Sequence, residues 1–348
     1  MITNFFSTLK PKLDYPKIFI FDSTDEKFYK VKRLLSKKAF RRKVLVIGTH
    51  NGIFHSDEVL ACSILCLNGS YKEIWIIRTR DESILKECDI CVDVGGGVYD
   101  HHTEKKFRSN GQIYASAGLV WNDFGRSLLK KTLMKYFSEF KVDLAVAFST
   151  FDEEIIQVVD YEDNGVPCDR QNPFNYITAF HPRWDKTSPK DFNEQFKKVL
   201  KITISVLEEQ LKDCLSRVYS KATLLERWNN PEFFQNGILK IPSQTFKWPI
   251  PCIEINDSIT DESKKINFVI FKHPCGDWAA QCVALNKKDL FGKRIPFPEA
   301  WAGLDASTLP AISGVETATF CHLGCFFIRA KTEEDVIKMC KIAMGINS

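Results

Sequence analysis

The fold is decided by residues 44–67, whose sequence is VLVIGTHNGIFHSDEVLACSILCL. The apolar run Val44–Ile47 is typical of a buried parallel strand, and Gly48 marks the point where the strand gives way to a loop. Ser56 can cap a helix, two acidic residues follow it, and apolar side chains then recur at helical spacing as far as Leu67. We therefore predict a strand, a loop and a helix, which is the opening of an α/β fold.

The same pattern continues toward the C-terminus. Apolar runs predict further strands at Ile74–Ile77 and Ile90–Val94, and helical periodicity predicts helices over residues 115–129 and 142–159. Because strands and helices alternate, we expect a mainly parallel sheet. These elements make up a predicted first domain over residues 44–185.

The remaining chain divides into a helical and a mixed part. Helical periodicity without proline extends from Asp191 to Trp228, which predicts one long helix or a helix pair as a connector over residues 186–230. Strand-like runs then alternate with Pro and Gly at residues 237–241, 267–271 and 278–284. We expect residues 231–348 to form a smaller α+β domain that closes over a substrate.

The composition is that of an ordinary globular protein. The chain has 348 residues, of which 44% are hydrophobic and 26% charged. We expect no membrane association, because no apolar run approaches the roughly 20 residues that span a bilayer. Twelve cysteines are scattered without a disulfide framework or a preceding signal peptide. This pattern indicates reduced thiols in an intracellular compartment.

The positive charge is concentrated at the N-terminus. Residues 1–43 contain 12 Lys and Arg against 4 Asp and Glu, so they sum to +8 in a chain whose net charge is +4. We predict a basic N-terminal arm. Three interpretations of this arm stay open, namely a nuclear localisation signal, a segment that contacts a phosphate backbone, and a solvated basic helix.

Histidines and aspartates cluster in the predicted first domain. Four of the seven histidines lie there within about fifty residues of each other, at His50, His55, His101 and His102, beside aspartates at the ends of predicted elements. Side chains at the carboxyl ends of parallel strands meet at one edge of the sheet. Imidazole and carboxylate together suit Mn²⁺, Fe²⁺ or Zn²⁺, and several carboxylates permit a two-metal phosphoesterase site. Taken singly, a His-His pair is often incidental and an aspartate after a strand is often a helix cap.

Several segments can be compared with a known family, namely Gly48–Glu58, Val92–Gly96, Asp100–His102, Ser116–Trp121, Asp160–Gly165, Phe297–Leu304 and Phe320–Thr332. In sequence and order they resemble the blocks of the MYG1 family, within the DHH phosphoesterase superfamily. The resemblance covers residues from about 44 to 345 and leaves the first 43 outside it. It implies a DHH-like first domain, followed by the connector and the smaller α+β domain.

The resemblance also implies an activity and a site. The activity is that of a 3′–5′ exonuclease acting on RNA, with two Mn²⁺ ions, or Mg²⁺ or another transition metal, in the nucleus or mitochondrion, with the cytoplasm left open. Asp93 would bridge the metals, His102 would face the phosphate, and Asp100 would orient the paired histidines. The implied metal ligands are His50, His55, Asp57, Asp93, His101 and Asp160.

Three further residues in family-like segments are candidate substrate contacts, namely His181, His322 and Arg329. Arg329 stands where relatives tend to have glycine, so it could either bind or block a phosphate. The loop Gly97–Tyr99 is shorter than is usual in the family. Two other functions therefore stay open, a small-molecule phosphohydrolase acting on pyrophosphate or short oligonucleotides, and an RNA-binding protein of reduced activity. The oligomeric state is also open.

Overall fold

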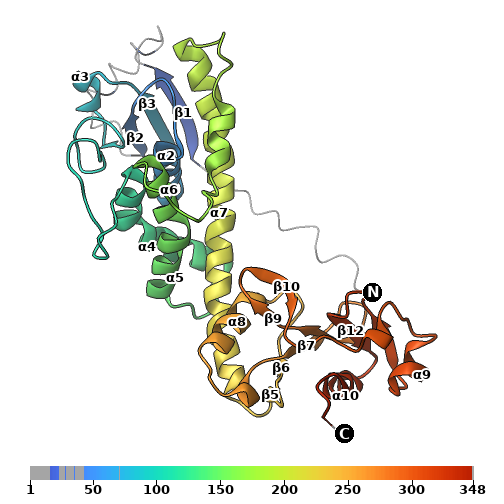
Figure 1. Ribbon diagram of the computed structural model, residues 1–348. Coiled ribbons are helices and arrows are strands. Elements are labelled where there is room, and N and C mark those ends of the chain that lie inside the picture. The colour runs from blue at the N-terminus through green and yellow to red at the C-terminus, as the bar shows by residue number, and fades with distance from the viewer. Residues whose placement is uncertain (1–15, 23–27, 29–34, 36–42, 70, 347–348) are drawn as a thin grey trace. The chain divides into compact units, whose positions relative to one another are not determined.

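The computed structural model describes residues 16–22, 28, 35, 43–69 and 71–346. The chain divides into two compact units, Met1–Leu215 and Ser216–Ser348. Figure 1 draws the first unit in blue to yellow-green and the second in yellow to red. Most of the predicted basic arm lies outside the described residues. No helix in the described part of the chain combines the length and apolar character needed to cross a membrane.

The first unit contains a four-stranded parallel sheet, as predicted (Figure 1). The order of its strands is β1 (Lys17–Asp22), β3 (Glu73–Arg78), β2 (Val44–Thr49) and β4 (Ile90–Cys91). β1 comes from the segment that we predicted as an arm. It pairs with β3 from the Lys17–Glu73 pair to the Asp22–Arg78 pair, so this part of the segment belongs to the sheet.

β4 is shorter than the predicted strand Ile90–Val94 and ends at Cys91. Val92 forms only an isolated bridge with Tyr99. Asp93 has a backbone φ of 56°, in the left-handed region that non-glycine residues rarely adopt. The strand prediction was wrong at this end because the chain turns sharply at Asp93.

A layer of helices accompanies the sheet. α2 (Ser56–Asn68) is buried from Ser56 to Cys66 and packs against α4 (Ser116–Tyr136), which also contacts α5 (Leu144–Phe151) and α6 (Gln157–Asp163). The helix predicted over residues 142–159 is divided, because the π-helical turn η2 (Asp152–Ile156) separates α5 from α6. Such turns are frequently found at functional sites. The short elements α3 (Glu82–Leu85) and η3 (Asn175–Phe180) also belong to this unit.

A helix of 40 residues, α7 (Pro189–Trp228), follows. It confirms the long helix predicted from the periodicity between Asp191 and Trp228. The boundary between the two compact units falls within this helix, after Leu215.

The second unit is built on a mixed six-stranded sheet, in which β6 and β7 pair parallel and the other neighbours pair antiparallel. The order of its strands is β11 (Ala318–Cys321), β12 (Phe327–Ala330), β8 (Trp278–Cys282), β7 (Phe268–Lys272), β6 (Ile238–Lys240) and β5 (Phe234–Gln235). The predicted strand over residues 278–284 is interrupted at Val283. β9 (Ala284–Asn286) turns away there to pair with β10 (Asp289–Lys293).

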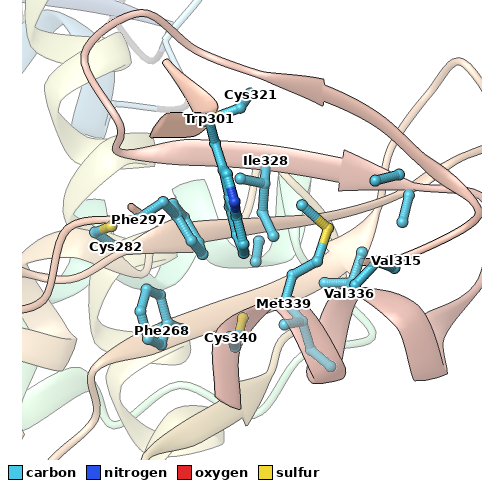
Figure 2. Packing of buried hydrophobic residues seen from close by; sticks show 14 of the residues in the cluster. Phe268, Cys282, Phe297, Trp301, Val315, Cys321, Ile328, Val336, Met339 and Cys340 are labelled. Atoms are coloured by element: carbon cyan, nitrogen blue, oxygen red, sulfur yellow. The ribbon is translucent and has the colours of Figure 1, made fainter. Parts of the chain in front are cut away.

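Two apolar cores form from alternating residues of these strands. Phe268 belongs to one core and Val269 to the other, as expected when successive side chains point to opposite faces. The first core includes Phe297, Trp301 and Met339 (Figure 2). The helices and short 3-10 turns of this unit are α8 (Pro249–Asp257), η4 (Glu262–Lys264), η5 (Glu299–Trp301), α9 (Leu309–Ser313) and α10 (Glu333–Ala343).

Candidate metal centre

His50 stands directly after β2, at the carboxyl end of the sheet. Its Nε2 atom lies 3.0 Å from Glu58 Oε1 and 3.2 Å from Asp93 Oδ2, and the ring is almost fully buried. Burial by itself lowers the pKa of His50, but hydrogen bonds and charge from Asp93 and Glu58 outweigh it and raise that pKa to about 10. The two carboxylates therefore favour a positive charge at this point.

Asp93 contacts histidines on both sides of the site. While its Oδ2 atom faces His50, its Oδ1 atom lies 3.5 Å from His101 Nδ1 and 3.3 Å from His102 Nδ1. The Ser116 hydroxyl also donates to this Oδ1 atom at 3.5 Å. One buried carboxylate thus contacts imidazoles from two separate segments, and its left-handed backbone directs it between them.

His101 is surrounded by carboxylates. Its Nε2 atom lies 3.0 Å from Asp163 Oδ2, and its Nδ1 atom lies 3.9 Å from Asp57 Oδ2. Asp57 is held in turn by α4, because the backbone N–H groups of Ser116 and Ala117 donate to it at 3.1 and 2.6 Å. Burial raises the pKa of Asp57 well above its usual value, and the nearby charges of Asp163, Asp93 and Asp160 raise it further. Such a gathering of acids favours a cation.

His102 is the exposed member of the His-His pair, with 62% of its side chain accessible. Asp100 accepts from the His102 backbone N–H, and Asp100 Oδ1 lies 3.0 Å from His102 Nδ1. Its other oxygen accepts from Gly96 N at 2.7 Å. Burial raises the pKa of Asp100, but these hydrogen bonds outweigh it and leave the pKa lowered. Asp100 therefore contacts His102, whereas no such contact joins it to His101 among the described residues.

His55 caps the N-terminus of α2 together with Glu58. The Glu58 side chain accepts from the His55 backbone N–H at 2.8 Å, in a capping box. The His50 and His55 rings lie 6.1 Å apart between centroids. His50, His55 and Glu58 form one group whose nitrogen and oxygen atoms lie close enough to hold a metal ion.

Two residues support the loop between His50 and His55. The Arg78 guanidinium donates to Gly52 O at 2.7 Å, and Gly52 has a φ of 83° that favours glycine. His181 Nε2 lies 2.6 Å from Phe54 O, and its ring packs edge-on against the Phe54 ring. His181 therefore anchors this loop, and it is not among the residues that line the cavity described below.

Asp160 contacts different groups from those we expected for a ligand. It is fully buried, its Oδ2 atom accepts from Arg108 Nη2 at 2.6 Å, and its Oδ1 atom accepts from Gly118 N at 3.0 Å. Burial raises the pKa of Asp160 to about 7, although Arg108 opposes the rise. Asp160 is absent from the metal-holding groups found in the described residues, whereas Asp163 belongs to one with Asp57 and His101.

The four histidines of this centre, together with Asp93 and Asp163, line a cavity of about 790 Å³. Arg80 contributes a positive charge to the wall of the cavity. Its lining consists of His50, Asn51, Ile53, His55, Ser56, Arg80, Asp93, His101, His102, Glu162, Asp163, Asn164 and Thr178. All of these residues belong to the first unit.

Comparison with known proteins identifies the family. Residues 46–344 match the family model MYG1_exonuc, described as an uncharacterised protein family (UPF0160). The chain belongs to the MYG1 family. The human protein named MYG1 exonuclease is 28% identical over 330 residues, which cover 87% of this chain and 86% of the human one. The MYG1 protein C27H6.8 of Caenorhabditis elegans is 27% identical over 330 residues, covering 86% of this chain and 95% of its own. No solved structure matches the chain.

Two of the candidate substrate contacts lie in the second unit of this MYG1-family chain. The His322 Nδ1 atom accepts from Gly324 N at 2.9 Å, in the connection between β11 and β12. Arg329 lies on β12, and its guanidinium lies 3.7 Å from Asp277 Oδ2. Their relation to the cavity of the first unit stays a prediction.

Glu58 and Asp163 were not among the residues that we selected from the sequence. Glu58 looked like an ordinary acid in the first turn of a helix, although its spacing from His55 matches a capping box. Asp163 lies in the same family-like segment as Asp160, three residues later, so the motif alone could not choose between them.

Proposed function

We propose that this protein is a metal-dependent nuclease that removes nucleotides from the 3′ end of RNA. The observation that supports it best is the position of Asp93, whose two carboxylate oxygens face His50 on one side and the His101–His102 pair on the other. A carboxylate shared between two groups of ligands is what a dinuclear hydrolase requires.

The residues present fit two divalent ions. One position would be formed by His50, His55 and Asp93, with Glu58 beside them, and the other by Asp57, Asp93, His101 and Asp163. Mixed imidazole and carboxylate ligands suit Mn²⁺ better than Mg²⁺, which prefers oxygen ligands alone. We therefore propose Mn²⁺ as the metal. Asp160 would act from outside this set, by holding the first turn of α4 through Gly118.

Two divalent ions bound there would neutralise phosphate charge and supply a water molecule of lowered pKa as the nucleophile. The protein's own side chains would position the substrate. His102 is exposed at the cavity and is oriented by Asp100, so it can donate a hydrogen bond to a phosphate oxygen. Arg80 adds a positive charge to the wall, and the amides of Asn51 and Asn164 can hydrogen-bond a sugar or base.

The nucleic-acid substrate is supported by the relatives. The human, mouse and bovine proteins are each named MYG1 exonuclease. The cavity of about 790 Å³ falls within the size range of sites that hold a small ligand, so it can take a terminal nucleotide rather than a duplex. RNA as the polymer and the 3′–5′ direction are proposed from the resemblance of the sequence motifs to the family.

The test is digestion of a 5′-labelled single-stranded RNA with Mn²⁺, in the wild-type protein, Asp93→Asn and the exposed-site control Asp169→Asn. We expect a ladder that shortens from the 3′ end for the wild type and for Asp169→Asn. It should disappear for Asp93→Asn and in the presence of a chelator. RNA that stays intact under Mn²⁺ contradicts the proposal.

Two additional reactions separate the alternatives. If RNA stays intact while inorganic pyrophosphate is hydrolysed, and Asp93→Asn stops this hydrolysis, the protein is a small-molecule phosphohydrolase. If RNA binds equally well with Mn²⁺ and with chelator and nothing is cleaved, the protein is an RNA-binding protein without this activity.

A further inference from the structure

A second group of chemically reactive side chains lies in the second unit, on the turn that joins β7 to β8. The Cys275 Sγ atom lies 2.9 Å from the His273 Nδ1 atom and 2.9 Å from the Arg329 Nη1 atom. A thiol, an imidazole and a guanidinium therefore meet at one sulfur atom. None of the three belongs to the metal centre.

The backbone fixes this arrangement. The His273 N–H donates to Asp277 O at 2.9 Å, and the Gly276 N–H donates to His273 O at 3.0 Å. Gly276 has a φ of 96°, which only glycine adopts readily, so the tight turn presents Cys275 outward. The geometry of the thiol thus depends on a defined turn.

Arg329 reaches the thiol from the neighbouring strand. It lies on β12, opposite Ala279 of β8. Its guanidinium lies 3.7 Å from Asp277 Oδ2 and 5.1 Å from the centroid of the Phe320 ring. These two contacts hold the guanidinium beside the sulfur.

Cys275 is also accessible. All twelve cysteines lie within the described residues and all are free thiols. Eight are buried, and Cys88, Cys91 and Cys168 are partly buried. Cys275 alone is exposed, so a reagent in solution can reach it most readily.

The neighbours of Cys275 suit a nucleophile rather than a metal ligand. His273 Nδ1 accepts from the Cys275 backbone N–H at 3.3 Å and lies 2.9 Å from the sulfur, so its lone pair can take the thiol proton in exchange for this backbone hydrogen bond. Arg329 donates to the sulfur, so a positive charge lies beside the atom that would attack a reagent. A guanidinium in contact with the sulfur disfavours a metal cation at the same atom.

We propose that Cys275 is a site of covalent modification by low-molecular-weight disulfides. The Cys275 sulfur attacks one sulfur of the disulfide, the S–S bond of the reagent breaks, and a mixed disulfide forms on Cys275. The other half of the reagent leaves as a thiolate, which takes up the proton that His273 accepted. The proposal is independent of the nuclease assignment, because it concerns only residues of the second unit.

The test compares the reaction rates of the twelve thiols in the folded full-length protein. The protein is treated with a limiting amount of iodoacetamide and digested, and labelling at each cysteine is quantified by mass spectrometry. We expect Cys275 to be labelled first. Oxidised glutathione should add one mixed disulfide at Cys275, and dithiothreitol should remove it. Faster labelling of Cys88, Cys91 or Cys168 overturns the proposal.

Matched variants separate activation from simple exposure. Arg329→Gln and His273→Asn should each slow labelling of Cys275 by roughly fivefold, because each removes one activating neighbour. Lys331→Gln, which removes an exposed cation without a contact to Cys275, should leave the rate unchanged. Arg329→Lys should restore part of the rate, and thermal unfolding checks that each variant is folded. If Arg329→Gln and His273→Asn are both folded and react within twofold of the wild type, the proposal fails.

Discussion

The Asp163 carboxylate lies against His101, with its Oδ2 atom 3.0 Å from the His101 Nε2 atom. Asp160, one turn earlier on α6, directs its Oδ2 atom to Arg108 at 2.6 Å. Two carboxylates on the short helix α6 therefore lie in different surroundings. One faces the cavity, and the other is buried beneath α4. This division predicts different consequences for otherwise identical substitutions.

Asp163→Ala should abolish activity with little effect on stability. It removes a proposed metal ligand at the cavity wall, and we expect kcat/KM for a phosphodiester substrate to fall at least about 100-fold. The free energy of unfolding should change by less than about 1 kcal/mol. Steady-state kinetics and urea denaturation measure the two effects. Activity within threefold of the wild type would remove Asp163 from the proposed site.

Asp160→Ala should instead destabilise the fold. It takes one carboxylate from the buried Arg108 guanidinium and the acceptor from the Gly118 N–H group. The free energy of unfolding should fall by about 3 kcal/mol. Asp152 still pairs with Arg108, at 3.0 Å, which keeps the loss from being larger. Urea denaturation measures this free energy. A loss smaller than that of Asp163→Ala contradicts the structural role given to Asp160.

Gly118 should tolerate no side chain. A Cβ atom there would lie 2.0 Å from Asp160 Oδ2 and 2.8 Å from Arg108 Nη2. We expect Gly118→Ala to lower the free energy of unfolding by more than about 2 kcal/mol. Gly97→Ala is the matched control, because nothing lies within 4 Å of a Cβ atom at that position. Equal melting temperatures for the two variants would contradict the expected steric conflict at Gly118.

Asp100→Asn should weaken catalysis by loosening His102. The Asp100 carboxylate accepts from the backbone N–H groups of Gly96 and His102 and contacts His102 Nδ1. The amide of an asparagine can make only some of these contacts. We expect kcat to fall about tenfold, with the Mn²⁺ affinity changed by less than threefold. A large loss of metal binding would mean that Asp100 acts at the metals and not through His102.

Part of the fold followed from local patterns in the sequence. β2 and α2 were predictable because an apolar run, a loop and a capped helix follow one another within residues 44–67. β1 was missed because its residues Ile18–Phe21 lie within a strongly basic segment, and only pairing with β3 reveals the strand. β4 was predicted too long because no local pattern signals the left-handed backbone of Asp93.

The candidate site was predictable to a similar extent. His50, Asp93 and His101 could be selected because they stand at the ends of elements that meet at one edge of a parallel sheet. The choice between Asp160 and Asp163 depends on where α4 packs, which involves residues more than 40 positions away. Glu58 escaped selection for the same reason, because its contact with His50 exists only once the loop has folded back onto α2.

The most direct test of the two-metal proposal is the number of Mn²⁺ ions bound per chain, measured by equilibrium dialysis for the wild type, Asp93→Asn and Asp169→Asn. We predict two ions for the wild type and for Asp169→Asn, because Asp93 is intact in both. Asp93→Asn should bind one ion or none. Two ions held by Asp93→Asn with unchanged affinity, or none held by the wild type, would contradict a dinuclear centre joined by Asp93.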